Sequence, residues 1–328
     1  MLTSRRRTTG PQPTETMRVF ITGVGGFLGS HLAEFLLAQG MVVYGTVHRD
    51  TKNIEHLKSS LTVLPCNILD KQRIKTIVAE VKPDVVVHLA AQTLPVLSWR
   101  DAETTFQVNV SGTLYLLDAI REAGGDPVVE VACSSAEYGL TSEDEMPIKE
   151  TGEFRPASPY GVSKVAADLL SRLYWQTYGM KVVRLRPFFV IGPRKVGDVC
   201  SDSARGVVAV EKGRSDKLRV GNLDAVLDFV DVRDAVQAFW LLAEKGSPGE
   251  VYNVCSGVGH RVREVLELLI SLSGNEIRYR VVPEKMRPYD VRICIGDNFK
   301  LKALGWKPQI PLERTLALIL DYWRGIPE

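Results

Sequence analysis

The sequence lacks the cysteine and histidine patterns of a disulfide-stabilised or metal-binding protein. Its five cysteines are an odd number, lie far apart and include no Cys-x-x-Cys pair. Its five histidines show no metal-ligand spacing. These absences favour a reducing compartment, and we expect a cytoplasmic protein without a structural metal.

Charge of one sign and long apolar runs are also missing. The 41 basic side chains nearly balance the 39 acidic ones, so the chain has no charge excess of the kind that binds nucleic acid. No stretch approaches the roughly 20 apolar residues that cross a bilayer. The 328 residues are 45% hydrophobic, enough for one large core or two smaller ones. We therefore expect small-molecule partners, and neither nucleic acid nor a membrane.

Residues 1–16 offer few side chains to a core. They are polar and rich in Arg, Thr and Pro, a composition that cannot offset the entropy lost on ordering. Arginines at 5–7 are compatible with an export signal, but the next apolar run, Val19 to Ile21, is short and leads directly into glycines. We expect a disordered leader.

From Met17 onward, short β-rich runs alternate with longer helical patterns. This alternation predicts an α/β fold with a Rossmann-type doubly wound parallel sheet. Strands are expected at 17–23, 42–47, 85–91, 127–135 and 181–187, and helices at 30–40, 72–81, 105–124 and 158–179.

The alternation loosens after Pro187, at a segment punctuated by Gly and Pro. We therefore assign residues 17–188 to a dinucleotide-binding domain and 189–328 mainly to a smaller α/β substrate-binding domain. A segment near 226–245 is expected to return to the first domain. The second region also holds an expected strand at 250–256 and expected helices at 203–213, 262–274 and 311–325.

A glycine-rich turn, TGVGGFLG, joins the first expected strand to the first expected helix. This is the strand-turn-helix context that a dinucleotide fingerprint requires. We expect Gly23 to permit the tight turn, Gly26 to let the backbone approach the pyrophosphate, and Gly29 to let the helix lie close to the sheet. Because a helix N-terminus presents N–H groups to an anion, we assign coenzyme binding to these glycines and to Phe27 and Leu28.

A tyrosine and a lysine are one turn apart at the start of the helix expected at 158–179. Tyr160 and Lys164 share one face, and an ammonium beside a phenol favours the phenolate, a useful acid or base near neutral pH. Ser134-Ser135, at the end of the preceding strand, adds a hydroxyl for a substrate oxygen, which we assign to Ser135. The alternative is a surface tyrosine beside a chance lysine.

With these motifs the chain resembles the extended short-chain dehydrogenase/reductase family of nucleotide-sugar enzymes. The resemblance implies that Ser135, Tyr160 and Lys164 are catalytic and that Lys164 also bonds the nicotinamide ribose. It further implies coenzyme contacts at Asn67, Ile68, Leu89, Ala90 and Ala91. The matching motifs are TGVGGFLG, HLAAQ at 88–92, NVSGT at 109–113, CSSAEYG at 133–139, SPYGVSK at 158–164 and IGPR at 191–194.

Within the family the chain looks most like the branch that acts on GDP-mannose derivatives. Its matches include SSAEYG, YNVCSG at 252–257 and LGWKP at 304–308. That branch contains a GDP-mannose 4,6-dehydratase and a GDP-6-deoxy-4-keto-mannose reductase. The turn GVGGFLG, which has no aspartate, and the short loop VHRDTKNIEHL resemble the reductase. We expect reduction of the 4-keto group of the GDP-linked sugar, with the dehydratase as the alternative.

Glu137 lies where this branch places the carboxylate that takes the C5 proton in the dehydratase. The reductase also tends to keep an acid there, so Glu137 is a candidate catalytic residue under both interpretations. Capping of a nearby backbone N–H is the structural alternative. A coenzyme-binding protein without catalysis is a third hypothesis, because a fold does not fix a function.

The substrate site is expected to include basic and polar residues of the second region. A planar guanidinium matches phosphate oxygens, so Arg219 and Arg287 are candidate diphosphate clamps, with a solvated surface charge as the alternative. Phe189 and Leu227 depart from the family pattern, which usually has an asparagine and an arginine for the diphosphate. The expected substrate-binding residues are Arg194, Asn222, Arg219 and Arg287.

The end of the second expected strand favours NADP over NAD. A carboxylate there would bond the ribose 2′-hydroxyl of NAD, but the sequence offers Thr46 and then His48 and Arg49. Arg49 suits the 2′-phosphate of NADP. Asp50 could neutralise Arg49, which keeps NAD as the alternative.

A homodimer is implied by the resemblance, assembled through the helix that carries Tyr160 and the helix near 103–122. Both helices have apolar positions beyond one buried face. These are Val165, Leu169 and Leu173 on one helix and Tyr115, Leu116 and Ala119 on the other.

Overall fold

The computed structural model describes residues 16–285 and 291–326. All of the predicted leader except Thr16 lies outside the described residues, and so does Arg287. No helix in the described part of the chain is long and apolar enough to cross a membrane.

Seven parallel strands form the central sheet, in the order β10-β6-β5-β4-β1-β2-β3. Strands such as β4 are buried along their whole length, as expected of a parallel sheet covered on both faces. The predicted doubly wound fold is confirmed. The strands are β1 (Arg18–Thr22), β2 (Val42–Val47), β3 (Leu61–Pro65), β4 (Val85–His88), β5 (Val128–Ala132), β6 (Val182–Pro187) and β10 (Val251–Val254).

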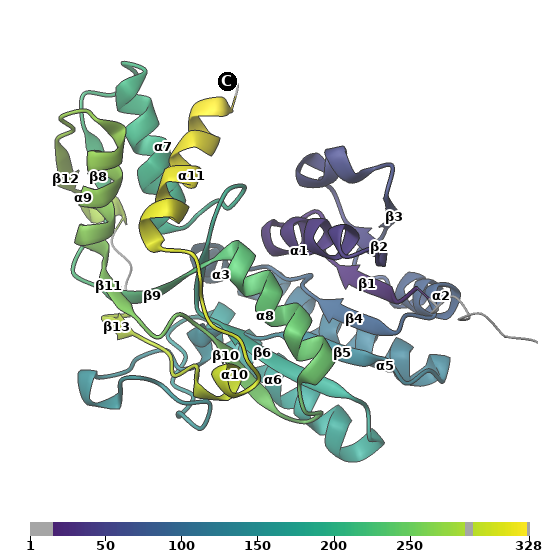
Figure 1. Ribbon diagram of the computed structural model, residues 1–328. Coiled ribbons are helices and arrows are strands. Elements are labelled where there is room, and N and C mark those ends of the chain that lie inside the picture. The colour runs from purple at the N-terminus through teal and green to yellow at the C-terminus, as the bar shows by residue number, and fades with distance from the viewer. Residues whose placement is uncertain (1–15, 286–290, 327–328) are drawn as a thin grey trace, which may run out of the picture.

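Helices cover both faces of this sheet (Figure 1). On one face α1 (Phe27–Ala38) and α8 (Val232–Lys245) bury one hydrophobic core. On the other face α2 (Lys71–Val81), α5 (Gly112–Ala123) and α6 (Pro159–Tyr178) bury a second core. Each helix has an apolar stripe toward the sheet, which is the physical reason for the layered arrangement.

Shorter helical segments connect these layers. The helix expected at 105–124 is one helical run over residues 102–123, in which the π-helical turn η2 lies between α4 and α5. The segments are η1 (Lys52–Leu57), α3 (Pro95–Arg100), α4 (Ala102–Phe106), η2 (Gln107–Ser111), η3 (Ser135–Glu137) and η4 (Glu143–Glu145).

A smaller second region surrounds its own hydrophobic core. Its strands form the ladder β11-β9-β13, with β7 also on β9, and the pair β12-β8. The strands are β7 (Phe189–Ile191), β8 (Leu218–Val220), β9 (Val226–Asp231), β11 (Gly259–Arg261), β12 (Tyr279–Val281) and β13 (Ile293–Cys294). The helices are α7 (Val199–Glu211), α9 (Val262–Ser273), η5 (Pro283–Lys285), α10 (Phe299–Ala303) and α11 (Leu312–Gly325).

The chain crosses between the two regions more than once. Strand β9 belongs to the small ladder, α8 returns to the large sheet, and β10 becomes an edge strand of that sheet beside β6. Sequence periodicity indicates a strand at 250–256 but not which sheet it joins, because pairing is decided by tertiary contacts. The roles of the two regions in binding coenzyme and substrate stay predictions.

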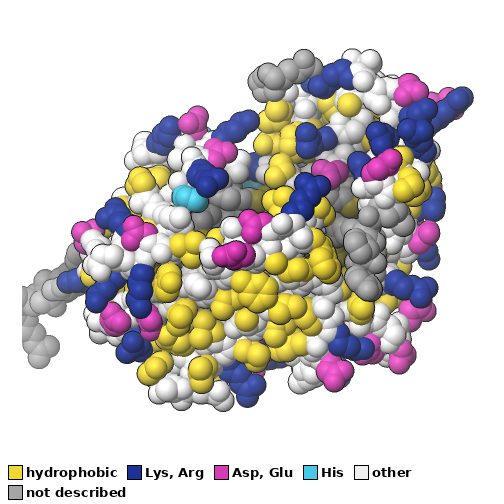
Figure 2. Space-filling view, turned by 180° about the vertical axis from the view of Figure 1, so that it is seen from behind, with side chains coloured by type: hydrophobic (Ala, Val, Ile, Leu, Met, Phe, Trp, Pro, Cys, Tyr) yellow, Lys and Arg dark blue, Asp and Glu magenta, His cyan; other side chains and the backbone are white. Residues whose placement is uncertain are grey.

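The face of α5 and α6 carries apolar side chains that residues 16–285 and 291–326 leave exposed. Figure 2 shows a broad hydrophobic area on this side of the molecule. Leu169 and Leu173 on α6 are 49% and 52% exposed. Leu116 and Ala119, also expected at a subunit interface, are instead buried inside the core between α5 and the sheet. They cannot contribute to an interface, because the chain's own strands cover them.

Candidate active site

The glycine turn between β1 and α1 has a backbone that only small residues permit. Gly23 has a φ of +73°, and a Cβ on it would lie 3.0 Å from the Cα of Ala90. A Cβ on Gly29 would lie 2.5 Å from the carbonyl oxygen of Gly23, so this glycine lets α1 lie close to the turn. Gly26 is the N-cap of α1, no side chain caps this helix and its first turn holds no acidic residue. Uncapped N–H groups attract phosphate, so the turn fits a coenzyme pyrophosphate.

The ends of β1 and β4 are tied together beside this turn. The Thr22 hydroxyl accepts from the N–H groups of Leu89 and Ala90 at 3.2 and 3.1 Å. It also lies 2.7 Å from Nδ1 of His88, whose Nε2 lies 3.0 Å from the Thr113 hydroxyl. Burial lowers the pKa of His88 to about 3, so this imidazole is a neutral structural group.

The loop after β2 closes over the glycine turn. Arg49 is exposed at the end of the strand. The carboxylate of Asp50 accepts from the N–H of Lys52 at 2.8 Å, and the amide of Asn53 donates to the carbonyl of Gly25 at 3.0 Å. Asp50 is therefore engaged with the first residue of η1.

The predicted adenine contacts follow β3. Asn67 is exposed, and its side-chain oxygen accepts from the N–H of Leu69 at 3.0 Å. Ile68 is buried, and a Cβ on Gly112 would lie 2.9 Å from its side chain. Ala91 is half-buried in the loop after β4.

Tyr160 is fixed at the start of α6 by contacts from three segments. The hydroxyl of Ser158 caps the helix by accepting from the N–H of Gly161 at 3.1 Å. The N–H of Tyr160 donates to the hydroxyl of Ser98 on α3 at 3.0 Å. A Cβ on Gly161 would lie 2.7 Å from the carbonyl oxygen of Ala136. The glycine thus lets α6 lie against the segment that follows β5.

The two serines of this segment have different partners. The hydroxyl of Tyr160 hydrogen-bonds to the side chain of Ser134. The side chain of Ser135 hydrogen-bonds instead to the thiol of Cys294 on β13. The structure therefore brings together Tyr160 and Ser134, whereas the sequence interpretation assigned this role to Ser135. Consecutive residues at the entrance to η3 direct their side chains differently, and a catalytic role for Ser135 stays a prediction.

The acidity of Tyr160 is governed by its burial. Burial raises the pKa of Tyr160 to about 12, and the hydrogen bond to Ser134 partly offsets this rise. Burial lowers the pKa of Lys164, whose Nζ donates to the carbonyl of Ala132 at 2.7 Å. The direction of the Tyr160 pKa shift is opposite to the expected shift toward phenolate, because burial disfavours the charged phenolate. A tyrosine that keeps its proton suits proton donation.

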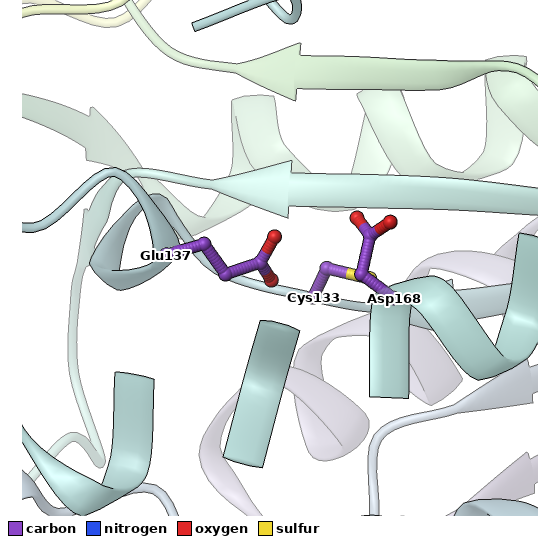
Figure 3. A group of neighbouring side chains, drawn as sticks. All are labelled: Cys133, Glu137 and Asp168. Atoms are coloured by element: carbon purple, nitrogen blue, oxygen red, sulfur yellow. The ribbon is translucent and has the colours of Figure 1, made fainter. Parts of the chain in front are cut away.

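The side chain of Glu137 belongs to a buried ion cluster with Arg186 and Asp168. Its carboxylate accepts from the N–H of Ser134 at 2.9 Å and lies 2.9 Å from Nε of Arg186. Arg186 also contacts the carboxylate of Asp168 at 3.0 Å. Figure 3 shows the Glu137 carboxylate extending toward Cys133 and Asp168. Burial and the neighbouring Asp168 raise the pKa of Glu137.

Three of these side chains lie close enough to share a metal ion. Ligand atoms of Cys133, Glu137 and Asp168 are within 4.8 Å of one another. The guanidinium of Arg186 already places a cation against both carboxylates. Burial raises the pKa of the Cys133 thiol, whereas a metal requires the thiolate. The chemistry of the cluster fits an arginine and not a metal.

The predicted substrate-binding residues lie in separate local networks. Arg194 donates to the hydroxyl of Ser30 at 3.2 Å and to Glu34 at 2.6 Å, both on α1. Arg219 pairs with Glu284 at 3.3 Å on the surface. The side-chain oxygen of Asn222 accepts from the N–H of Asp224 at 2.9 Å. None of the contacts described for these three involves Tyr160, and Arg287 lies outside the described residues.

Sequence reasoning missed two buried residues that hold the site together. Ser98 holds the N–H of Tyr160, and no local pattern marks it. Asn109 lies in the π-helical turn, where its amide donates to the carbonyl of Gln92 at 3.0 Å and to the hydroxyl of Ser163 at 2.9 Å. The motif NVSGT contains Asn109, but only the fold brings it to α6.

A Rossmann-type sheet with a glycine turn after β1, and with Tyr160 and Lys164 at the head of α6, defines a dinucleotide-dependent enzyme of the short-chain dehydrogenase/reductase type. Residues 20–319 match the family described as GDP-mannose 4,6 dehydratase. The chain belongs to this family of NAD(P)-dependent nucleotide-sugar enzymes, which confirms the predicted resemblance.

Relatives with two activities are similar to the chain. GDP-6-deoxy-D-mannose reductase of Pseudomonas aeruginosa is 34% identical over 315 residues, covering 94% of this chain and 98% of that protein. GDP-mannose 4,6-dehydratase of Vibrio cholerae is 31% identical over 345 residues, covering 92% of each.

Two solved structures share the fold along nearly their whole length. The RMD protein of Pseudomonas aeruginosa in complex with NADPH has a TM-score of 0.82 and 34% identity, covering 94% of this chain and 99% of that one. UDP-glucose 4-epimerase of Thermus thermophilus in complex with NAD has a TM-score of 0.85 and 33% identity, with the same coverage.

Proposed function

We propose that this chain is a reductase that converts the 4-keto group of a GDP-linked 4-keto-6-deoxy-mannose to a hydroxyl, with NADPH as the reductant. The relative named GDP-6-deoxy-D-mannose reductase supports the substrate, and the solved structure in complex with NADPH supports the coenzyme. The exposed Arg49, whose neighbour Asp50 is engaged at η1, supports NADPH over NADH.

The chain's own residues supply the proton and the orientation. When bound, the reduced nicotinamide supplies a hydride to C4 of the sugar. Tyr160 gives its hydroxyl proton to the sugar oxygen, so the C=O bond becomes a C–H and an O–H bond. Ser134 holds the tyrosine hydroxyl, and Lys164, one helical turn along α6, bonds the nicotinamide ribose.

The observation that favours the reductase over the dehydratase is the engagement of Glu137. A dehydratase needs a carboxylate to remove the C5 proton, but the Glu137 side chain is fully buried and its two oxygens contact Ser134 and Arg186. It cannot reach a sugar without losing both contacts. A reductase has no such step and needs no such base.

Two incubations of purified protein separate these functions. With NADPH and the 4-keto-6-deoxy sugar nucleotide, we expect one NADPH consumed for each sugar reduced. With GDP-mannose alone, we expect no loss of water by mass spectrometry. Dehydration of GDP-mannose without net NADPH consumption would replace the reductase with the dehydratase. The control is Tyr160→Phe, which we expect to lack activity while still binding the coenzyme.

A further inference from the structure

The backbone of Ser134 is hydrogen-bonded to the buried carboxylate of Glu137. Its hydroxyl accepts from the N–H of Ala136 at 3.1 Å, and its own N–H donates to Oε1 of Glu137 at 2.9 Å. These reciprocal bonds form a capping box around η3. The backbone of Ser134, and with it the direction of the hydroxyl that bonds Tyr160, therefore depends on Glu137.

Arg186 fixes the other oxygen of this carboxylate. Its Nε lies 2.9 Å from Oε2 of Glu137, and its NH1 donates to the Tyr138 hydroxyl and the Glu150 carbonyl, each at 2.9 Å. Its guanidinium also lies over two aromatic rings, 5.1 Å from the centroid of Tyr138 and 4.7 Å from that of Phe154. These contacts hold the planar guanidinium of Arg186 in one orientation, and the ion pair with Arg186 therefore restricts the Glu137 carboxylate to one position.

An exposed copy of the glutamate and arginine part of this arrangement lies at η4, where the Ser142 hydroxyl caps no backbone N–H and instead donates to Glu145 at 2.8 Å. In η4 the N–H of Ser142 donates to Oε2 of Glu145 at 2.8 Å, and Arg155 pairs with the other oxygen. The side chain of Glu145 is 34% exposed, whereas that of Glu137 is 0% exposed. A Ser-x-x-Glu cap with an arginine partner therefore does not need burial to form. Burial of the first copy carries a desolvation cost that the exposed copy avoids.

We propose that Glu137 is a positioning residue for the reaction, which acts through Ser134 to hold the Tyr160 hydroxyl where it can give its proton to the substrate. The inference rests on the proposed function in one respect, that Tyr160 is the proton donor. Glu137 itself does not touch the substrate.

A double-mutant cycle tests this role. A glutamine at 137 has one oxygen and one NH₂ group. If its oxygen keeps accepting from the N–H of Ser134, its NH₂ group faces the Arg186 guanidinium and the ion pair at 2.9 Å is lost. We expect Glu137→Gln to lower kcat at least about tenfold while the NADPH Kd and the KM for the 4-keto sugar stay within about threefold. When Ser134 is already alanine, adding Glu137→Gln should lower kcat little further. If Glu137 acts through Ser134, the effects of the two substitutions on kcat are not additive.

The control is Glu145→Gln, which breaks the exposed copy and should leave kcat within about twofold. The positioning role would be overturned if the loss of kcat in the double variant equals the product of the losses in the two single variants. It would also be overturned if kcat is unchanged in Glu137→Gln. If Glu137→Gln does not fold, Arg186→Lys loosens the same carboxylate and takes its place in the cycle.

A readout without substrate separates this inference from the proposed function. In hydrogen–deuterium exchange, the Ser134 amide should exchange at least about tenfold faster in Glu137→Gln and unchanged in Glu145→Gln. Equal exchange of the Ser134 amide in Glu137→Gln and Glu145→Gln would overturn the inference. Absence of turnover by the wild-type protein, with faster Ser134 exchange in Glu137→Gln, would reject the reductase but keep the link between Glu137 and Ser134.

Discussion

The backbones of Gly23 and Ala90 meet so closely that a Cβ on Gly23 would lie 3.0 Å from the Cα of Ala90. This contact joins the turn after β1 to the end of β4 at the carboxyl edge of the sheet, where ligands bind in doubly wound folds.

Gly23→Ala should therefore weaken NADPH binding at least about tenfold and lower the free energy of unfolding by about 1–2 kcal/mol. Coenzyme fluorescence titration and urea unfolding measure the two effects. Gly40 has a similar φ of +79°, but no atom of the described residues would lie within 4 Å of a Cβ on it. Gly40→Ala should share the backbone strain and keep coenzyme affinity, and equal loss of affinity in both variants would contradict a role for the Ala90 contact.

Tyr160→Phe removes the proposed proton donor and leaves its surroundings intact. Turnover should fall at least about a hundredfold, with the coenzyme Kd nearly unchanged. Because Ser134 and not Ser135 bonds the tyrosine, Ser134→Ala should lower kcat more than Ser135→Ala. Steady-state kinetics of the three variants check both statements, and a larger effect at Ser135 would return the role to that residue.

Arg49→Ala tests the choice of coenzyme. The guanidinium can form a charge-assisted bond only to the 2′-phosphate, so the variant should lose NADPH affinity more than NADH affinity. Arg18→Ala is the control, because Arg18 begins β1 at the opposite edge of the sheet and pairs with Asp84. Equal losses for NADPH and NADH in Arg49→Ala would reject Arg49 as the phosphate ligand.

Glu130 is a buried carboxyl group in the middle of β5, and its two oxygens have no hydrogen-bond partner among the residues that the structure describes. Its register partners are Val87 on β4 and Val183 on β6, both in the core beneath α1 and α8. Burial raises the pKa of Glu130 well above its ordinary value. The native state therefore keeps a proton that the unfolded chain releases, and folding loses up to about 1.4 kcal/mol per pH unit as pH rises above about 4.5.

Glu130→Leu should remove this pH dependence. We expect its free energy of unfolding to exceed that of the wild type at pH 8, with a gap that narrows as the pH falls toward 5. Urea unfolding at several pH values measures the gap. A gap that is constant with pH would mean that Glu130 does not hold a proton in the native state.

The exposed apolar face of α6 supports the predicted homodimer. Leu169 and Leu173 are about half exposed. The side of the molecule shown in Figure 2 carries a broad hydrophobic area. In analytical ultracentrifugation at micromolar concentration we expect a dimer for the wild type and a monomer for Leu169→Arg/Leu173→Arg. The control is Val258→Arg, which places an arginine at an exposed valine outside α5 and α6. A monomeric wild type would exclude the dimer.

Much of the fold follows from patterns that are local in the chain. Alternating apolar runs indicate four of the first five strands in the chain, β1, β2, β4 and β5. They do not indicate β3, because its exposed Thr62 and half-buried Val63 give a weak signal. The strand at 250–256 is recognisable, yet its place beside β6 is not, because strand pairing joins residues far apart in the sequence.

The sequence by itself determined the features that are encoded within a few residues. The glycines of the turn and the one-turn spacing of Tyr160 and Lys164 fall into this group, because backbone sterics and the helical repeat act locally. Only the tertiary structure decided which hydroxyl meets Tyr160 and where Glu137 points. Ser134 faces the tyrosine and Glu137 faces Arg186 because α6 and β6 pack against the short turn η3, and a side chain's direction in such a turn is set by what lies against it.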